Sequence, residues 1–264
     1  DGGRGAPLGV EEAPRVTGVR LYLRPSLRPL GDGAIRIGIG EGIDPSVHRR
    51  VRAACLALDR ARLPGVLECV PTYEAVTVFY LPTLVRYAEL EGAIEAALSG
   101  LREGEVPVGR RFTLPVRYGG EWGPDLESLA SSHGMSPGEA IEAHQGVAYR
   151  VYMIGFAPGF PYLGGLPERL WTPRLETPRT AVPAGSVGIG GEQTGVYPLE
   201  TPGGWRIIGR TPVPLYDPSQ TPPALLAAGD FVRFRSVGTE EYRDVEDRVS
   251  RRTYAVESAP HEGA

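Results

Sequence analysis

The sequence contains neither lysine nor asparagine, so all 28 of its basic residues are arginines. Without lysine, the chain cannot form a Walker A phosphate loop, a Schiff base or a biotin attachment site. If the reaction of this protein uses ATP, the ATP site must therefore be shared with a partner subunit or located on one. The missing asparagine, the two methionines and the 26 prolines suit a thermophile and a GC-rich genome equally well.

Charge and hydropathy give no sign of nucleic acid or membrane as a partner. The formal net charge is −4 and the isoelectric point is about 5.7, so no basic field covers the whole protein. No apolar run reaches roughly 18 residues, and the Gly- and Pro-rich start has no hydrophobic signal core. We therefore predict a cytoplasmic protein in which residues 1–14 form a loose N-terminal tail.

Cysteine is scarce as well, with only Cys55 and Cys69 in the chain. Both lie in apolar surroundings, one in a helical and one in a strand-like segment. This context favours buried free thiols, with a disulfide or a metal pair as the alternatives. No spacing typical of metal ligands is visible elsewhere, and we predict no metal site.

Residues 15–105 are predicted to form a compact α+β domain. Asp44 and Pro45 have the pattern of a helix N-cap followed by a first-turn proline, and Pro64-Gly65 would end that helix near residue 62. A second helix is expected over 83–101, with Leu84 on its apolar side. The expected strands are 19–23, 33–39, 66–71 and 75–81. This element order resembles a ferredoxin-like arrangement.

Residues 106–238 are predicted to form a mostly-β barrel domain. Two short helices are expected near its start, one from Pro124 or Asp125 and one from Ser136, which has capping-box spacing to Glu139. After Val147 the helical period disappears, and short strands alternate with loops rich in glycine and proline. The expected strands are 111–117, 148–155, 186–190, 205–210 and 231–235. Residues 239–264 are predicted to be a charged C-terminal tail, helical or disordered.

The loops between residues 144 and 211 are the part of the sequence that points to a binding site. Proline stiffens a loop, while glycine lets backbone N–H groups approach a ligand closely. Long loops of this composition are either tight barrel turns or binding loops. We interpret them as a preorganised pocket for a small polar amide or carboxylate.

The same segment carries a long, ordered series of motifs. It includes VRYGG (116–120), GPDL (123–126), YRVYMIGF (149–156), PGFPYLGG (158–165), PAGSVG (183–188) and GD (229–230). In these motifs the chain resembles the family that includes the B subunit of 5-oxoprolinase, allophanate hydrolase subunit 1, carboxyltransferase domains and the sporulation histidine-kinase inhibitor. The resemblance spans about residues 110–236, and the first 105 residues match mainly in element order.

The resemblance implies a ferredoxin-like N-terminal domain followed by a cyclophilin-like β-barrel. It also implies a heteromeric complex with a C subunit, which has a similar barrel, and with a separate A subunit. Such a complex would convert 5-oxo-L-proline to L-glutamate with ATP. An amide is resonance-stabilised, so phosphorylation of the carbonyl oxygen would provide a good leaving group. The site would then need cations and hydrogen-bond donors.

Candidate substrate-binding residues follow from this chemistry, but no catalytic residue can be named. Arg179 and Arg210 are the candidate cations, with a structural ion pair as the alternative for each. Gln193 and Thr194 could orient an amide or stabilise a turn. His144 could be a general base, although a structural histidine is favoured. The aromatic candidates, which could form core or pocket wall, are Phe160, Tyr162 and Tyr197.

Two other functions remain open at this stage. The chain could inhibit a sensor histidine kinase by binding its dimerising helical domain. It could also be the carboxyltransferase half of a urea-type biotin carboxylase, which would require a biotin carrier on another chain. An allophanate hydrolase is disfavoured, because the Ser-Ser-Lys machinery of an amidase cannot form without lysine.

Overall fold

The chain divides into two units between Pro107 and Val108. The computed structural model describes residues 20–101 and 103–261. The tail predicted for residues 1–14 and the start of the strand predicted at 19 lie outside the described residues. The division after Pro107 falls close to the domain boundary that the sequence predicts after residue 105.

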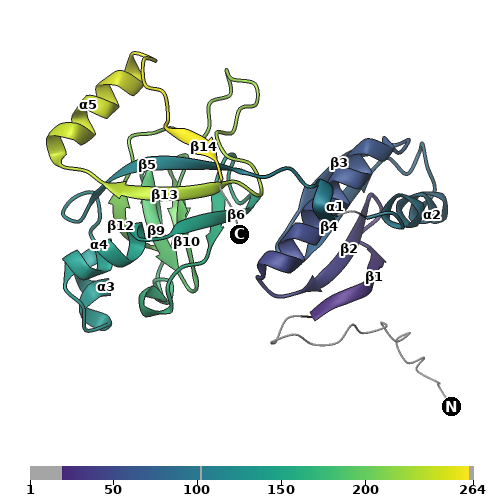
Figure 1. Ribbon diagram of the computed structural model, residues 1–264, viewed down its shortest axis with the longest axis horizontal. Helices are drawn as coiled ribbons and strands as arrows, with labels where there is room; N and C mark the ends of the chain where they lie inside the picture. The colour runs from purple at the N-terminus through teal and green to yellow at the C-terminus, as the bar shows by residue number, and fades with distance from the viewer. Residues whose placement is uncertain (1–19, 102, 262–264) are drawn as a thin grey trace. The chain divides into compact units, whose positions relative to one another are not determined.

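The first unit is a four-stranded antiparallel sheet with two helices (Figure 1). Its strands run in the order β1-β2-β4-β3, and the apolar side chains of β2 and β4 pack with those of α1 and α2 in one core. The name ferredoxin-like stays a prediction. The elements are β1 (Arg20–Pro29), β2 (Ala34–Glu41), α1 (Pro45–Ala61), β3 (Val66–Pro71), β4 (Ala75–Tyr80), α2 (Tyr87–Leu98) and the 3-10 helix η1 (Glu103–Glu105).

Helix α1 begins at the predicted residue, whereas helix α2 begins later than predicted. The Asp44 carboxylate accepts a hydrogen bond from the Ser46 backbone N–H at 2.7 Å, so α1 begins at Pro45 as expected. Helix α2 begins at Tyr87 rather than at residue 83. The backbone N–H of Arg86 donates to the Glu89 carboxylate at 3.3 Å, which places the helix start after Arg86. Leu84 therefore lies in the preceding turn with 69% of its surface exposed.

The second unit is a closed β-barrel with helices packed around it. Among the described residues, seven strands form the ring in the order β12-β9-β10-β7-β6-β13-β5, and pairing of β12 with β5 closes it. The strands are β5 (Arg110–Tyr118), β6 (Ala148–Ile154), β7 (Pro161–Gly164), β9 (Ser186–Gly190), β10 (Gln193–Val196), β12 (Arg206–Arg210) and β13 (Phe231–Ser236). The prediction of a barrel is therefore confirmed, and cyclophilin-like stays a prediction for its type.

The other elements of this unit lie around the ring. The capping box predicted at Ser136 is present, because Ser136 N–H donates to the Glu139 carboxylate at 2.8 Å and Glu139 N–H donates to Ser136 Oγ at 3.2 Å. Strands β8 and β11 form a separate two-stranded sheet. The elements are α3 (Leu126–Ser132), α4 (Pro137–Gln145), η2 (Glu168–Leu170), β8 (Arg179–Val182), β11 (Thr201–Gly203), α5 (Thr239–Ser250) and β14 (Ser258–Pro260).

The segment after residue 238 is not a separate tail. Helix α5 buries Tyr242 and Val245 against the barrel, and β14 pairs with β5 through the register Ser258 to Phe112. The charges that suggest a tail belong to the exposed side of α5, and one of them, Glu241, forms an ion pair at 2.7 Å with Arg235 of β13. Of the two alternatives predicted for this segment, the helical one is confirmed over α5, because a few buried apolar residues are enough to fix a short amphipathic helix on a sheet.

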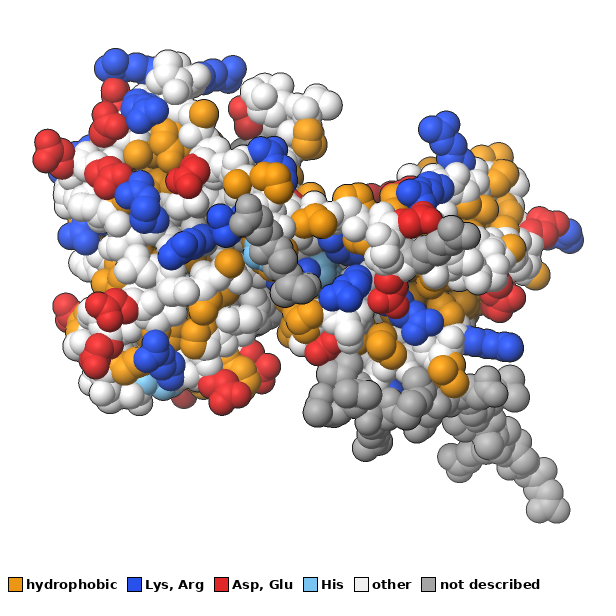
Figure 2. Space-filling model, in the orientation of Figure 1, with side chains coloured by type: hydrophobic (Ala, Val, Ile, Leu, Met, Phe, Trp, Pro, Cys, Tyr) orange, Lys and Arg blue, Asp and Glu red, His pale blue; other side chains and the backbone are white. Residues whose placement is uncertain are grey.

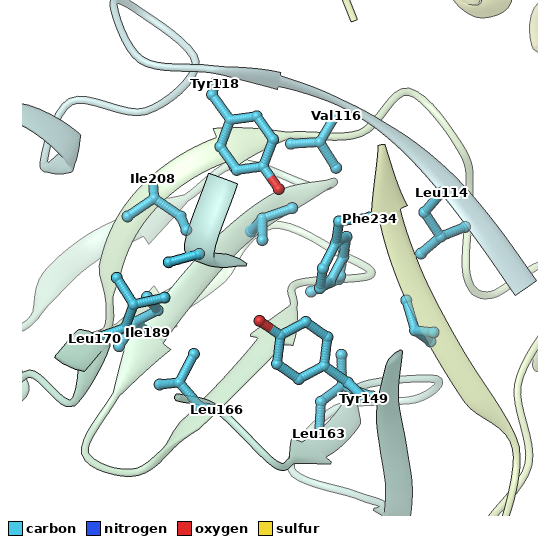
Figure 3. Packing of buried hydrophobic residues seen from close by; sticks show 14 of the residues in the cluster. Leu114, Val116, Tyr118, Tyr149, Leu163, Leu166, Leu170, Ile189, Ile208 and Phe234 are labelled. Carbon is cyan, nitrogen blue, oxygen red and sulfur yellow. The ribbon is translucent and has the colours of Figure 1, made fainter. Parts of the chain in front are cut away.

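The barrel interior is filled by large apolar side chains from the ring (Figure 3). Leu114, Val116, Leu163, Ile189 and Phe234 are all nearly or fully inaccessible to solvent. Such dense filling leaves no channel through the barrel, so a ligand site must lie at a rim or on the outside. In the part of the chain that the structure describes, no helix is both long and apolar enough to cross a membrane.

Candidate functional site

An aromatic pocket lies outside the main barrel core, over strands β7, β10, β11 and β12. Its volume is about 210 Å³. Four of its five aromatic lining residues, Phe160, Tyr162, Tyr197 and Trp205, pack in a small apolar cluster that is separate from the barrel core. We call this site the aromatic pocket. Its remaining lining residues are Phe156, Arg174, Pro178, Pro202, Gly203 and Gly204.

Edge-to-face packing fixes the rings of the aromatic pocket around Phe160. The Phe160 ring centroid lies 5.1 Å from that of Tyr162, 5.3 Å from that of Tyr197 and 5.5 Å from that of Trp205. These are favourable distances and angles for aromatic pairs. Because Phe160 is only 2% exposed and touches all three other rings, the pocket wall is rigid before any ligand binds.

Glycines in the neighbouring strands make room for this packing. A Cβ atom added to Gly203 would lie 2.4 Å from the Tyr197 hydroxyl oxygen. A Cβ atom added to Gly190 would lie 2.6 Å from the Trp205 Nε1 atom. Both contacts are shorter than carbon can tolerate, so glycine is required wherever a strand backbone meets these rings.

Phe156 stands at the pocket in a conformation that phenylalanine rarely adopts. Its φ is +65°, in the left-handed region, and 63% of its surface is exposed. The tight loop that follows holds it there, since Gly155 N–H donates to the Phe160 carbonyl at 3.1 Å. Its ring contacts Phe160 edge to face at 5.4 Å. Backbone strain combined with an exposed aromatic ring is a feature of binding sites.

One cation faces the aromatic pocket. The Arg174 guanidinium lies over the Trp205 ring, 5.8 Å from its centroid. Burial raises the pKa of the Tyr162 and Tyr197 hydroxyls, and the positive charge of Arg174 opposes that rise at both. Arg174 is exposed and forms no ion pair within the described part of the chain. The site therefore combines apolar ring faces, two neutral hydroxyls and an uncompensated positive charge.

Arg179, which sequence analysis proposes as a cation for substrate, has a structural partner instead. Its Nη2 atom lies 2.8 Å from Asp125 Oδ1, and Asp125 is almost completely buried. The other carboxylate oxygen of Asp125 accepts a hydrogen bond from Ile207 N–H at 2.6 Å. Asp125 therefore neutralises Arg179 and ties the start of α3 to β8 and β12.

Arg210 and Gln193 are not brought into the aromatic pocket. Arg210 Nε donates to the Ala184 carbonyl at 2.8 Å and so stabilises the turn before β9. Gln193 is the first residue of β10 and pairs with Gly190 in the ladder. Of the predicted residues, only Phe160, Tyr162 and Tyr197 lie together in the pocket. Their role in substrate binding stays a prediction.

His144 and Thr194 lie in the barrel interior, where no substrate reaches them. Both are fully buried. Thr194 Oγ1 donates to the Gly188 carbonyl at 2.9 Å, so it must accept its second hydrogen bond from His144 Nε2, also at 2.9 Å. His144 Nδ1 then accepts from the Tyr118 hydroxyl at 2.8 Å. Burial lowers the pKa of His144 to about 3, which excludes a general base for an external ligand at neutral pH.

Arg174 is the charged pocket residue that the sequence analysis did not identify. A signal was present, because the triplet Thr-Pro-Arg occurs twice, ending at Arg174 and at Arg179. The two arginines have the same local sequence and differ only in their partners in space. No local pattern reports that Asp125 lies beside Arg179 and not beside Arg174.

The structure also bears on metals, thiols and surface charge. Cys55 and Cys69 are free and partly buried, and burial raises the pKa of Cys55 to about 12 and that of Cys69 to about 11. Within residues 20–101 and 103–261, no group of three or more His, Cys, Asp or Glu side chains could hold a metal ion. Basic and acidic side chains are interspersed on the face shown in Figure 2. On that face, no broad area of one charge sign would attract an anion.

A family model and a curated relative both place this chain in one protein family. Residues 25–226 match the family model of the carboxyltransferase domain, subdomain C and D. The B subunit of 5-oxoprolinase from Bacillus subtilis (strain 168) is 44% identical over 233 residues, which cover 84% of this chain and 97% of the relative.

Two solved structures extend the comparison. The crystal structure of TTHA0988 is 38% identical with a TM-score of 0.71, and the match covers 81% of this chain and 41% of that one. The urea amidolyase of K. lactis has the same fold over 95% of this chain at 19% identity, with a TM-score of 0.74, and the match covers 17% of its own length. This chain thus spans less than half the length of either solved relative.

Proposed function

Because the chain belongs to the carboxyltransferase domain family, we propose that it is the B subunit of an ATP-dependent 5-oxoprolinase. The observation that carries the proposal is the 44% identity to the Bacillus subtilis 5-oxoprolinase B subunit over nearly the whole length of that protein. A small rigid pocket with one uncompensated cation supports it, since the substrate of such a complex is a small cyclic amide with a carboxylate.

We propose that this chain works with an A subunit and a C subunit in the cytoplasm, and that ATP binds to one of these partners. The aromatic pocket does not fit ATP. The sequence has no lysine for a phosphate loop, and a pocket of about 210 Å³ is below the roughly 300–1,000 Å³ of sites for drug-sized ligands. The solved relative TTHA0988, which is more than twice as long as the matched region, supports a site completed by further domains.

The proposal also includes the type of each domain. In the first unit, β1 lies beside β2, in the place where a ferredoxin-like sheet carries its fourth strand. The order β1-β2-β4-β3 matches that of a ferredoxin-like sheet, with one difference. The strand at this edge, β1, comes at the start of the chain segment instead of at its end. We assign the closed barrel of the second unit to the cyclophilin-like type on the motif series alone.

Reconstitution tests the proposal. The chain is co-expressed with candidate A and C subunits, and glutamate release is measured with and without ATP and 5-oxo-L-proline. We expect release only with all three subunits and both small molecules, and none from the isolated chain. Robust ATP-dependent release by the single chain would refute the need for partners. A complex that ignores 5-oxo-L-proline but carboxylates urea from a biotin carrier would refute the proposed reaction.

A further inference from the structure

We infer that the aromatic pocket binds the ring of the lactam substrate and that Arg174 binds the carboxylate of the substrate. This inference rests on the proposed function and adds to it the place where the substrate binds and the residue that determines specificity. The size of the pocket, the groups that line it and the balance of charge around it all support this assignment.

The size of the pocket selects a ligand with a single small ring. Its volume of about 210 Å³ leaves no room for a nucleotide, and the edge-to-face packing around Phe160 prevents the wall from widening. Flat ring faces and two prolines offer contact to a compact five-membered ring. The exposed Phe156 at the pocket would lose its contact with water when such a ring binds, and this burial of apolar surface would favour binding.

The polar groups of the pocket match a lactam. The Tyr162 and Tyr197 hydroxyls, which both line the pocket, are neutral at physiological pH, because the ordinary pKa of tyrosine is about 10 and burial raises it further at both. A neutral hydroxyl both donates and accepts, so it can pair with the carbonyl or with the N–H of a cyclic amide.

The balance of charge identifies Arg174 as the carboxylate ligand. Two arginines follow the same Thr-Pro dipeptide, but the buried Asp125 neutralises Arg179 at 2.8 Å. Arg174 forms no ion pair with a described residue, and the face of Trp205 supports its guanidinium. A guanidinium held in this way can bind a carboxylate through two parallel hydrogen bonds. The pocket therefore distinguishes a lactam that carries a carboxylate from the bare lactam ring.

The test uses the reconstituted three-subunit complex with Arg174→Gln, Arg174→Lys and the control Arg243→Gln. Arg243 is an exposed arginine on α5, far along the chain from the pocket. We expect Arg174→Gln to raise the KM for 5-oxo-L-proline by about tenfold or more, the range given by loss of a charge-assisted hydrogen bond. Arg174→Lys should recover part of that loss, because lysine keeps the charge but not the two parallel bonds. The control should behave as wild type.

A second readout measures ligand binding without turnover. Saturation-transfer NMR on the full chain compares 5-oxo-L-proline with pyrrolidin-2-one, which has the same lactam ring and no carboxylate. We expect wild type to prefer 5-oxo-L-proline and Arg174→Gln to lose this preference while still binding the bare ring.

The outcomes separate the two proposals. An active complex in which Arg174→Gln keeps the wild-type KM overturns the assignment of Arg174 and leaves the proposed function intact. A complex that does not turn over 5-oxo-L-proline overturns the proposed function. In that case the pocket assignment is decided by NMR: loss of the carboxylate preference in Arg174→Gln supports it, and absence of binding to wild type overturns it.

Discussion

The buried histidine of the barrel should make the second unit less stable as the pH falls below neutral. His144 has a pKa of about 3 in the folded protein because burial disfavours its charged form, against 6.5 when exposed. Between these values the unfolded chain binds a proton that the folded chain does not bind. The stabilisation is therefore complete above pH 6.5 and is lost progressively as the pH falls toward 3.

The size of the effect follows from the two pKa values. Between pH 8 and pH 5, preferential protonation of the unfolded state should lower the free energy of unfolding by about 2 kcal/mol. The carboxylates contribute little in this window, because their ordinary pKa values lie near 4. A change of about 2 kcal/mol is a large part of the stability of a domain and is easily measured.

Tryptophan fluorescence during urea unfolding is a suitable assay. All three tryptophans, Trp122, Trp171 and Trp205, lie in the second unit, so the signal reports on the barrel alone. The test variant combines Tyr118→Phe with His144→Gln, which keeps the hydrogen bond to Thr194 and leaves no hydroxyl without a partner. We expect this variant to be less stable at pH 8 but to lose most of the pH dependence between 8 and 5.

A matched control is His133→Gln, a half-buried histidine whose Nε2 lies 2.9 Å from Thr172 Oγ1. It should retain the wild-type pH dependence. If the double variant kept the full change of about 2 kcal/mol, the low pKa of His144 would be refuted and another group would be responsible.

Three further predictions concern the framework of the site. Asp125→Asn should lower the free energy of unfolding by about 2 kcal/mol in the same urea assay, because it leaves Arg179 without a counter-charge. The control Glu241→Gln, which removes an exposed ion pair, should lower it by less than about 1 kcal/mol. Gly190→Ala should displace Trp205, shift its fluorescence and lower the free energy of unfolding by about 1–3 kcal/mol. The control Gly204→Ala, where the nearest atom is 3.6 Å from the new Cβ, should change neither the fluorescence nor the stability. An unshifted fluorescence spectrum of Gly190→Ala would contradict the packing. A fragment of residues 108–264 should fold alone with dispersed NMR signals, and a fragment ending at 238 should be less stable because it lacks β14 and α5; equal stability would show that these elements are dispensable.

Local chemistry made part of the fold predictable. The caps at Asp44 and Ser136 depend on side chains within three residues of the helix start, so the sequence alone is sufficient to place α1 and α4. The strands that sequence analysis missed, β7, β8, β10, β11 and β14, have only three or four residues each. They exist because distant strands pair with them, and no periodicity can develop over so few residues.

The site was predictable in its composition but not in its charge. Aromatic residues among glycines and prolines pointed to Phe160, Tyr162 and Tyr197, which do share a pocket. Sequence could not distinguish Arg174 from Arg179, since the difference is the position of Asp125 some 50 residues earlier in the chain. It also could not show that His144 faces the barrel interior. Burial and the pairing of charges depend on tertiary structure, so local patterns in a single sequence do not reveal them.

The closure of the barrel has a consequence for the way the protein is made. Strand β5 begins the second unit, yet its partners β12, β13 and β14 are the last strands of the chain. A ribosome must therefore synthesise almost the entire unit before β5 finds any of its neighbours, whereas the hairpin of β1 and β2 in the first unit can form at once. The first unit should thus fold while the second is still a nascent chain with open strand edges. During this interval the second unit is exposed to aggregation, and rare codons or truncations near the C-terminus should lower the yield of soluble protein.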